Sequence, residues 1–377
     1  MAGWLLPLPR LVSALRQGVV AGALLVLAAA CQSNPAPTAT PEAASVAPSP
    51  SAAAAASPLP SPSPGLARPS PSAAPSLVPS PSPVVVASQG SIQLDDYPFA
   101  VMIDNIKEAR PHFGLADADV VYEAPAEGGI PRLMPIFLRA DTDVSSIGPV
   151  RSARHYFVYM ANEYRTPIVH IGASPQGIDA LGATGLPDLD EERGDAGFWR
   201  DPSRRAPHNA FVSTASIRDA LRQRGGPIKA SLGPLKFGDF VQGSQPATTV
   251  VIPYPGGERY MLEYDYDPDN QVYNRVMDGV PHLDGSTGQQ YTARSIIIQF
   301  ANTVAIPNDD AGRLDIALVG SGKGVLVADG TQVPLQWSKA SVRDATQFKR
   351  TDGAPFALPS GQVWIQIVPL ETQLSIT

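Results

Sequence analysis

The feature that most constrains how this chain can fold is a long stretch of proline, alanine and serine. Residues 32–90 contain 15 Pro, 14 Ala and 13 Ser, no aromatic side chain, and only Glu42 and Arg68 as charged residues. Such a segment has too little apolar surface to offset the conformational entropy that folding removes. Repeated Ser-Pro steps also favour an extended, polyproline-like chain. We therefore predict a disordered tether here.

The segment that precedes this stretch has the layout of a bacterial export signal. Arg10 and Arg16 are followed by 13 small or apolar residues, 18–30, and then by Cys31, the only cysteine in the chain. The apolar run is shorter than the ~20 residues that a membrane-spanning helix requires. The segment Leu-Ala-Ala-Ala-Cys resembles the lipobox of bacterial lipoproteins, with its leucine one residue further from the cysteine than is usual.

We therefore predict that residues 1–30 are a lipoprotein signal peptide and that residues 31–90 are a lipidated Cys31 followed by the disordered linker. Each buried CH₂ of an acyl chain contributes about 0.8 kcal/mol, so two or three chains would anchor the protein durably. The expected location is extracytoplasmic, on the outer face of the cell membrane. The alternative is an ordinary secretory signal in which the cysteine has no role.

The remaining residues, 91–377, are predicted to form a folded head. The chain has 28 Lys and Arg against 35 Asp and Glu, of which three and one precede residue 91, so the head has 25 against 34 and a net charge of −9. That charge argues against a nucleic-acid partner. A single cysteine also excludes an intrachain disulfide and a Cys-based zinc site. The head is large enough to build a core without them.

The first part of the head, residues 91–245, has the pattern of an α/β domain with a mixed sheet and helices. Its predicted strands are short apolar runs at residues 99–103, 120–123, 133–138 and 168–172. Apolar side chains at spacings of three and four predict a helix from Ser152 to about Tyr164. A second helix is expected over residues 214–224, with Ser213 or Thr214 as its cap.

The second part, residues 246–377, is predicted to be smaller and β-rich (α+β). Its strand-like runs are residues 250–252, 271–275, 295–300, 314–319 and 363–368. The pattern changes near Pro246, which we take as the boundary. The glycine-rich residues 320–324 lack the Lys-Ser/Thr ending of a phosphate-binding loop, so we predict a hairpin turn there.

Several short motifs resemble those of one bacterial family, in the same order and over nearly all of residues 95–370. They are Gly148-Pro149-Val150-Arg151-Ser152-Ala153-Arg154, Pro207-His208-Asn209, Pro281-His282-Leu283-Asp284 and Gly361-Gln362-Val363-Trp364-Ile365. The family is that of the YerB-like bacterial lipoproteins, formally domain of unknown function 3048, with N- and C-terminal parts. The resemblance implies an α/β part followed by a smaller β-rich part, and it implies no settled activity.

Three basic residues mark the start of the helix predicted from Ser152. Arg151, Arg154 and His155 have the spacing i, i+3, i+4, so we expect them to project from one face without acidic partners. Cations are unfavourable at a helix N-terminus unless an anion compensates them. Backbone N–H groups and guanidinium forks together suit a phosphate or a carboxylate. This pattern predicts an anionic-ligand site, and the alternative is an internal network of ion pairs.

The candidate acids and bases are three carboxylates at or just past strand ends, Asp104, Glu123 and Glu127, together with His170. Ligand sites in open α/β sheets gather at the carboxyl ends of strands. Two neighbouring carboxylates could act there as acid and base. The same carboxylates are the expected partners of the basic residues in the ion-pair alternative.

Further ligand-binding candidates are Ser174, His208 and Asn209. Ser174 follows a strand but does not lie in a Gly-x-Ser-x-Gly elbow, so capping of the next helix is the alternative for this residue. The chain has no HExxH motif and no close pair of histidines, so we predict no metal site and no cofactor. Structural, hydrogen-bonded histidines are the alternative for His170 and His208.

These features lead to one hypothesis and two alternatives. The hypothesis is a lipid-anchored cell-envelope protein of unknown biochemical activity that binds an anionic ligand or an envelope partner through its N-terminal domain. Its partners would be the membrane, through the anchor, and a cell-wall fragment, an anionic small molecule or an envelope protein. One alternative is a hydrolase or related enzyme acting on cell-wall polymer, so enzyme activity stays open. The other is a non-catalytic envelope scaffold.

Overall fold

The computed structural model describes residues 93–195, 197–255 and 260–377. The predicted signal peptide, Cys31 and the tether lie outside these ranges. The described residues form a mixed sheet with helices and further sheets in the C-terminal region, which confirms the predicted fold class of the head. Among these residues, no helix has both the length and the apolar composition needed to cross a bilayer.

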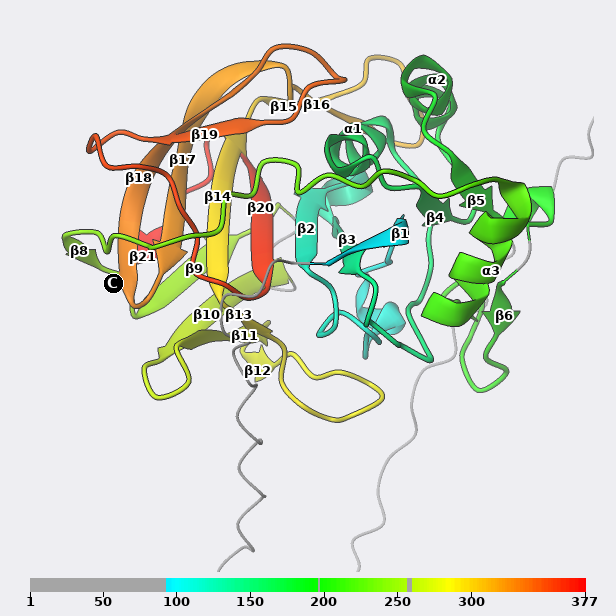
Figure 1. The fold of residues 1–377 in the computed structure, drawn as a ribbon, viewed down its shortest axis with the longest axis horizontal. Helices are drawn as coiled ribbons and strands as arrows, with labels where there is room; N and C mark the ends of the chain where they lie inside the picture. Colours follow the sequence, from blue (N-terminus) through cyan, green and yellow to red (C-terminus); the bar gives the residue numbers. More distant parts are fainter. Residues whose placement is uncertain (1–92, 196, 256–259) are drawn as a thin grey trace, which may run out of the picture. The chain divides into compact units, whose positions relative to one another are not determined.

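A mixed sheet of eleven strands forms the centre of the fold (Figure 1). Its strands follow the order β19-β18-β17-β14-β20-β2-β3-β1-β4-β5, and β8 pairs with β18 beside this path. The strands of this sheet are β1 (Leu94–Val101), β2 (Val120–Pro125), β3 (Pro131–Arg139), β4 (Ile168–His170), β5 (Asp188–Asp190), β8 (Gln245–Pro246), β14 (Ser295–Ala301), β17 (Gly320–Ala328), β18 (Thr331–Lys339), β19 (Gln347–Arg350) and β20 (Val363–Pro369).

A second sheet of six strands and several smaller elements complete the head. The second sheet consists of β9 (Thr249–Pro253), β10 (Met261–Asp267), β11 (Val272–Met277), β12 (Val280–Pro281), β13 (Thr292–Ala293) and β21 (Ser375–Ile376). Two short pairs are β6 (Trp199–Arg200) with β7 (Ala210–Phe211) and β15 (Thr303–Ala305) with β16 (Leu314–Ile316). The helices are α1 (His155–Tyr164), α2 (Pro175–Thr184), α3 (Thr214–Arg224) and the 3₁₀ turns η1 (Lys107–Ala109), η2 (Glu127–Gly129) and η3 (Glu191–Arg193).

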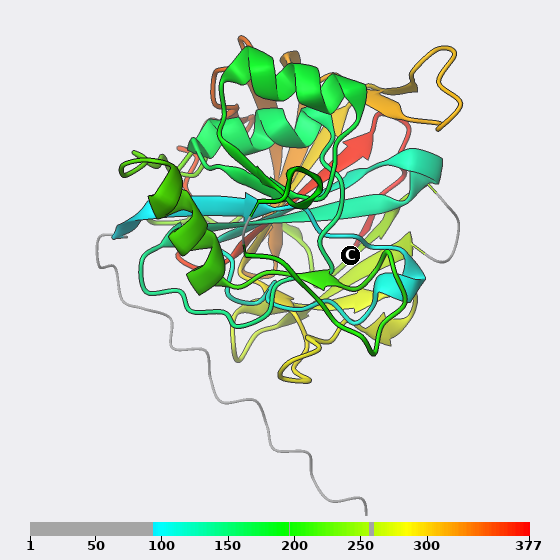
Figure 2. The ribbon, with the colours of Figure 1, turned by 90° about the vertical axis from the view of Figure 1, so that its right-hand side faces the viewer.

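Side-chain alternation gives the main sheet two apolar faces. In and just after β1, Phe99 and Val101 belong to one buried cluster, whereas Ala100 and Met102 belong to the other. A continuous apolar run fits a strand that is covered on both sides. Helices α1 and α2 cover one face of the sheet, and α3 and the second sheet cover the opposite face (Figure 2).

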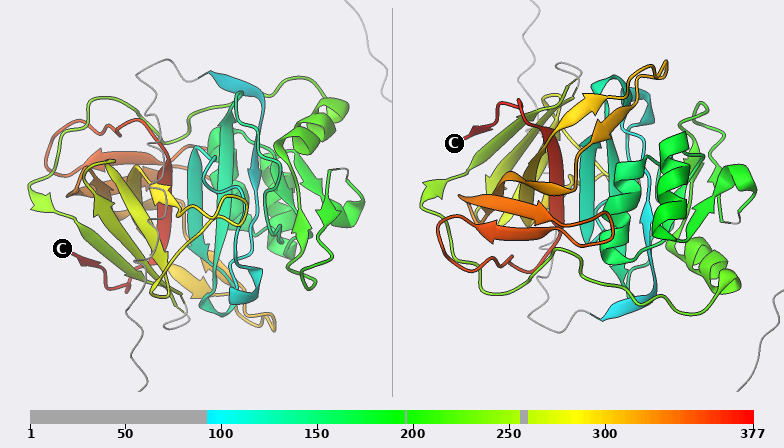
Figure 3. Two further views of the ribbon diagram at one scale, coloured as in Figure 1. Left: turned by 90° about the horizontal axis from the view of Figure 1, so that it is seen from below. Right: turned by 90° about the horizontal axis from the view of Figure 1, so that it is seen from above.

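The strand that joins the two halves of the head is β20, close to the C-terminus. It pairs in parallel with β14 on one side and with β2 on the other (Figure 3). Trp364, for example, lies beside Ile296 of β14 and Val121 of β2. One sheet therefore runs across the expected boundary near Pro246. The division into domains at that point stays a prediction.

The glycine-rich residues 320–324 are not the hairpin turn that their composition indicates. They form the first half of β17, which pairs with β18 and, from Gly324 onward, also with β14. A Cβ on Gly322 would lie 2.7 Å from Nε1 of Trp337, and one on Gly324 would lie 2.8 Å from the carbonyl oxygen of Ile298. These glycines are needed for close packing within a sheet, and composition does not distinguish that role from a turn.

We predict that Gly324→Ala lowers the free energy of unfolding by about 1–3 kcal/mol, because the added methyl group meets a strand backbone that cannot move aside. Gly182→Ala is the matched control, since the Cβ position of Gly182 in α2 faces open space. Alanine should raise the stability there by about 0.5–1 kcal/mol through its helix propensity. Urea unfolding followed by circular dichroism measures both changes. Equal effects at the two positions would contradict the packing role.

Candidate functional site

The basic residues predicted at a helix start lie mostly in front of the helix. Helix α1 begins at His155 rather than at Ser152, and its N-cap Arg154 has extended backbone angles, φ −127° and ψ 151°. Arg151 lies three residues before this N-cap. The three basic residues therefore do not share a helix face. The aromatic residues that indicated the helix start only at Tyr156, so their spacing could not locate its first turn.

Each of the three basic side chains has an acidic partner. Nε of Arg151 lies 3.0 Å from Oδ2 of Asp104, and Nε2 of His155 lies 2.9 Å from Oδ1 of Asp315. Nε of Arg154 pairs with Glu127. The ion pairs that we considered as the alternative are thus present, although two of the acids also hold other basic groups.

Glu127 fixes the segment that precedes α1. Its carboxylate binds Arg154 and also Nη2 of Arg132, which lies 3.0 Å away. The two arginines in turn donate to the carbonyl oxygens of Ser152 at 2.8 Å and Ala153 at 2.7 Å. Burial raises the pKa of Glu127, but the Arg154 hydrogen bond and the Arg132 charge outweigh burial and lower it. Arg154 therefore acts mainly as a support of the loop that carries Arg151.

Asp104, just after β1, holds two basic side chains with a single oxygen. Its Oδ2 accepts hydrogen bonds from Nε of Arg151 at 3.0 Å and from Nδ1 of His208 at 2.6 Å. The terminal nitrogens of Arg151 and Nε2 of His208 have no protein partner within the described residues. The exposed fraction of the side chain is 30% for Arg151, 16% for His208 and 8% for Asp104. Arg151 and His208 therefore present nitrogens without a hydrogen-bond partner at the carboxyl end of β1.

Arg204 fastens the loop that carries His208. Its Nε donates to the carbonyl oxygen of His208 at 3.1 Å, and its terminal nitrogens donate to those of Pro111 at 3.2 Å and Ala109 at 2.5 Å. Its guanidinium carbon also lies over two phenylalanine rings. Arg204 thus joins two loops beside Asp104 without using a carboxylate.

Beneath this surface, a buried ion pair joins the two sheets. Glu123 of β2 and Arg275 of β11 have fully buried side chains, and Nη2 of Arg275 lies 2.8 Å from Oε2 of Glu123. Arg275 also donates to the hydroxyl oxygen of Tyr264 at 2.6 Å and lies 4.3 Å from the ring centroid of Trp364. Burial lowers the pKa of Arg275, but the charge of Glu123 outweighs burial and raises it. Glu123 is therefore the counter-ion of a buried arginine.

Arg275 also begins a chain of hydrogen bonds that leads back to Asp104. Nε of Arg275 donates to Nδ1 of His282 at 2.9 Å, and Nε2 of His282 lies 2.7 Å from Nδ1 of His112. Nε2 of His112 lies 2.8 Å from the main-chain oxygen of Asp104. A guanidinium can only donate, so His282 accepts at Nδ1 and must donate from Nε2. His112 then accepts at Nδ1 and donates to the Asp104 carbonyl.

Burial keeps both imidazoles of this chain neutral. Desolvation, followed by the charge of Arg110, lowers the pKa of His112 to about 3. Desolvation, followed by the repulsion that would arise if His282 and its neighbour His112 were both charged, and then by the charge of Arg275, lowers the pKa of His282 well below its ordinary value. This series of hydrogen bonds fixes the backbone at Asp104 and thereby the carboxylate that binds Arg151 and His208, the partly exposed basic pair.

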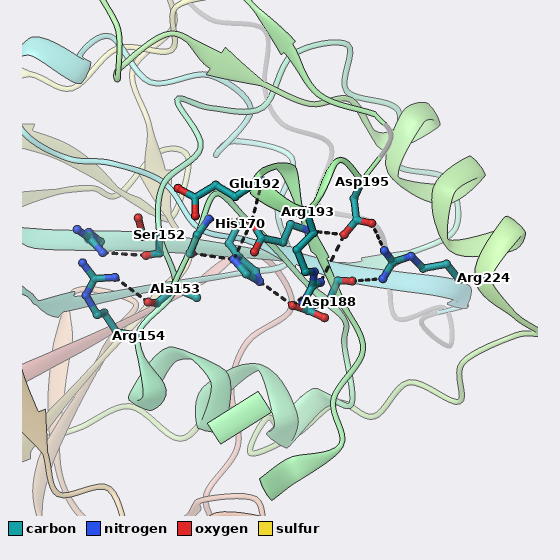
Figure 4. Close-up of polar contacts among 12 residues, drawn as sticks. Ser152, Ala153, Arg154, His170, Asp188, Glu192, Arg193, Asp195 and Arg224 are labelled. Atoms are coloured by element: carbon teal, nitrogen blue, oxygen red, sulfur yellow. Dashed lines mark hydrogen bonds and ion pairs between the residues drawn. The ribbon is translucent and has the colours of Figure 1, made fainter. Parts of the chain in front are cut away.

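His170, at the end of β4, has an acceptor at each ring nitrogen (Figure 4). Its Nδ1 lies 2.8 Å from the carbonyl oxygen of Gly172, and its Nε2 lies 3.0 Å from Oδ2 of Asp188. Arg193 binds the same Asp188 oxygen at 2.8 Å. Burial raises the pKa of Asp188, but the hydrogen bonds from His170 and Arg193 outweigh it and lower the pKa to about 2. Both nitrogens of His170 therefore donate within a structural network.

The two other ligand-binding candidates have local hydrogen-bonding roles. Ser174 is the N-cap of α2, and its Oγ accepts from the backbone N–H of Gly177 at 3.0 Å. Oδ1 of Asn209 accepts from Nη1 of Arg200 at 3.1 Å. No hydrogen bond or ion pair in the described part of the chain joins either of them to Arg151.

The described ranges contain no group of three His, Cys, Asp or Glu side chains that could hold a metal ion. A hollow of about 290 Å³ is lined by residues from β8, β17, β18 and nearby loops, among them Gly243, Gln332 and Asp352. None of these lining residues belongs to the predicted site.

Sequence reasoning missed the buried network of Arg275, His112 and His282. Arg275 occupies an inward position of β11 between the buried Tyr273 and Met277. A charged residue at a core position of an alternating strand was the available signal. Its partner Glu123 lies 152 positions away in the chain, so no local pattern could connect the two.

The fold and the site define a two-part head in which a C-terminal strand completes the N-terminal sheet. The family described as "Protein of unknown function (DUF3048) N-terminal domain" matches residues 87–227, and "Protein of unknown function (DUF3048) C-terminal domain" matches residues 250–365. The chain therefore belongs to the DUF3048 family of YerB-like proteins.

A relative named "Putative lipoprotein YerB", from Bacillus subtilis (strain 168), is 34% identical over 279 residues, which are 72% of this chain and 81% of the relative. The crystal structure of the YerB protein from Bacillus subtilis is also similar, with a TM-score of 0.62 and 31% identity. That similarity covers 74% of this chain and 93% of the crystallised chain.

The neutral imidazoles predict a loss of stability in acid. His112 has a pKa near 6.5 when unfolded and about 3 when folded, so between these values only the unfolded chain binds the proton. The contribution of this group to the free energy of unfolding is complete above pH 6.5 and falls by about 1.4 kcal/mol per pH unit toward pH 3. His112→Gln should flatten this slope in urea unfolding. His155→Gln is the control for the loss of a histidine, and a slope unchanged by His112→Gln would refute the assignment.

Proposed function

We propose that this protein is a lipid-anchored protein of the cell envelope whose head binds an anionic ligand at the carboxyl end of β1. The proposal has two parts, an anchor at Cys31 and a binding site on the head. The observation that carries the binding site is the convergence of Arg151 and His208 on one oxygen of Asp104, with their other nitrogens unused by the described residues.

The anchor is supported by the sequence and by the relative. An apolar run of 13 residues ends directly at the sole cysteine. The Bacillus subtilis relative is named as a lipoprotein. The proline-rich residues 32–90 would then separate the head from the outer face of the membrane. A tether of this composition lets the head reach ligands at a distance from its anchor.

The local charge balance supports an anionic ligand. The whole chain has a net charge of −7. Around Asp104, however, a single carboxylate holds both Arg151 and His208. Arg204, which lies in the loop of His208, binds only carbonyl oxygens. An anion bound there gains charge-assisted hydrogen bonds from the free end of the Arg151 guanidinium. An acidic group on an envelope partner could be recognised in the same way.

One observation favours hydrolysis of envelope polymer as a second candidate function. A buried carboxylate orients His208 through Nδ1 and leaves its Nε2 unused, which is the arrangement of a general base. The other acid/base candidates carry less of this proposal. Glu123 neutralises Arg275, Glu127 binds two arginines, and His170 donates from both nitrogens.

Replacing the proposed anchor residue tests the first part. We expect Cys31→Ser to move the protein from the membrane fraction to the soluble fraction or the medium, because no acyl chain is then attached. Metabolic labelling with a radioactive fatty acid, followed by fractionation, measures both effects. Fatty-acid labelling that persists in Cys31→Ser would contradict the anchor.

Replacing the exposed arginine tests the second part. Arg151→Ala should weaken binding of inorganic phosphate by about 10- to 100-fold, the usual loss for a hydrogen bond to a charged group. Its effect on the free energy of unfolding should stay below about 1 kcal/mol, because the Arg151–Asp104 pair is partly exposed. Calorimetry on the full chain in a neutral detergent measures the affinity.

Arg222→Ala is the matched control, because Arg222 on α3 is also exposed and forms an ion pair with Asp219. Phosphate binding that survives Arg151→Ala, or that is absent from the parent protein, would exclude this site. A large loss of stability in Arg151→Ala would instead indicate that the arginine serves the fold.

A further inference from the structure

The two side chains of the partly exposed basic pair, Arg151 and His208, lie close together where they meet Asp104. Nε of Arg151 and Nδ1 of His208 bind the same oxygen of Asp104, so they are at most 5.6 Å apart, the sum of 3.0 and 2.6 Å. A tetrahedral oxyanion has enough oxygens to accept hydrogen bonds from a guanidinium and an imidazole together. A carboxylate has only two oxygens, both in one plane, so it offers fewer directions from which two separate donors can bind it.

The orientation of His208 determines which of its protonation states can bind an anion. An ionised carboxylate only accepts hydrogen bonds, so Nδ1 of His208 carries a proton that points to Asp104. In neutral His208, Nε2 therefore has no proton, and its lone pair repels an oxyanion. In the imidazolium form, Nε2 carries a proton and donates to it. Ligand binding should thus require a second proton on this ring.

The charged groups around His208 act in opposite directions. Asp104 favours the imidazolium, whereas neighbouring cations oppose it unless a ligand adds negative charge. The groups that contact His208, the Asp104 carboxylate or the main chain beside it are Asp104, Arg151, Arg204, the neutral His112 and Arg110, which is itself paired with Asp278. A doubly charged ligand shifts this balance toward the imidazolium further than a singly charged one does.

We infer that Arg151 and His208 form a subsite for phosphate-type oxyanions that takes up one proton on His208 together with its ligand. This inference rests on the proposed anion-binding function and adds the ligand class and its dependence on pH. The phosphate can belong to a soluble phosphate ester or to a lipid headgroup, because the subsite recognises only the oxyanion.

The test uses sulfate as its first probe, because sulfate keeps two negative charges through the range in which histidine titrates. Any dependence on pH then belongs to the protein. The full chain in a non-ionic detergent, which adds no oxyanion of its own, is titrated by calorimetry at several pH values and in buffers of different ionisation enthalpy. We expect the affinity for sulfate to fall about tenfold per pH unit above the ordinary histidine pKa, with an uptake of about one proton.

His208→Gln should make the affinity for sulfate nearly independent of pH, because the amide keeps a neutral side chain of similar reach. His155→Gln is the matched control, since His155 faces Asp315 instead, and it should keep the pH dependence of the parent. Binding that needs Arg151 but does not change with pH would overturn this inference alone. Absence of any binding of sulfate or phosphate would overturn the proposed function as well.

A second set of titrations distinguishes the two sources of phosphate. Glycerol phosphate represents a soluble ester, and phosphatidylglycerol mixed into the detergent micelles represents a headgroup. Whichever source binds, the affinity should fall in Arg151→Ala and lose its proton uptake in His208→Gln. Binding that neither substitution changes would locate the anion elsewhere and overturn the subsite.

Discussion

The parallel pairing of β20 with β2 is the interaction on which the rest of the head depends. It places a strand from the C-terminal half inside the sheet of the N-terminal half, and the second sheet then covers the face that carries Glu123. Arg275 reaches Glu123 only because both halves are assembled. A buried charge without its partner costs several kcal/mol, so this ion pair penalises any separation of the halves.

The same contact between the two halves positions the candidate site. A series of hydrogen bonds leads from Arg275 through His282 and His112 to the main chain of Asp104. Both ring nitrogens of each of these two histidines have a partner in this series. These two histidines therefore have no ring nitrogen left for a ligand. At the outer end of the series, where the Asp104 carboxylate meets Arg151 and His208, the terminal nitrogens of Arg151 and Nε2 of His208 have no partner within the described ranges. The anion that we propose there would not have to break a buried hydrogen bond.

The sequence predicted the elements that local patterns determine. Residues 295–300 and 363–368 were recognisable as strands because most of their side chains are β-branched or aromatic, with a single Gln in each run. Ser213 caps α3 by accepting from the backbone N–H of Ser216. The predicted start of α1 was wrong, because the spacing of apolar side chains does not show where an extended segment, here ending at Arg154, becomes helical. The predicted turn at residues 320–324 was also wrong. These glycines pack closely against Trp337 of the neighbouring strand β18, and the local sequence pattern does not show that this strand lies beside them.

Three of the four short motifs that resemble the YerB-like family gain a common explanation from the structure. Arg151 of the first motif and His208 of the second bind the carboxylate of Asp104, and His282 of the third is connected to its main-chain oxygen through His112. Segments separated by more than fifty residues thus meet at one aspartate. A fold alone could be stabilised by apolar contacts, which avoid the desolvation cost of polar groups. The polar groups gathered around Asp104 are therefore the feature from which we propose a function at that residue, with Arg151 and His208 as its partly exposed contacts.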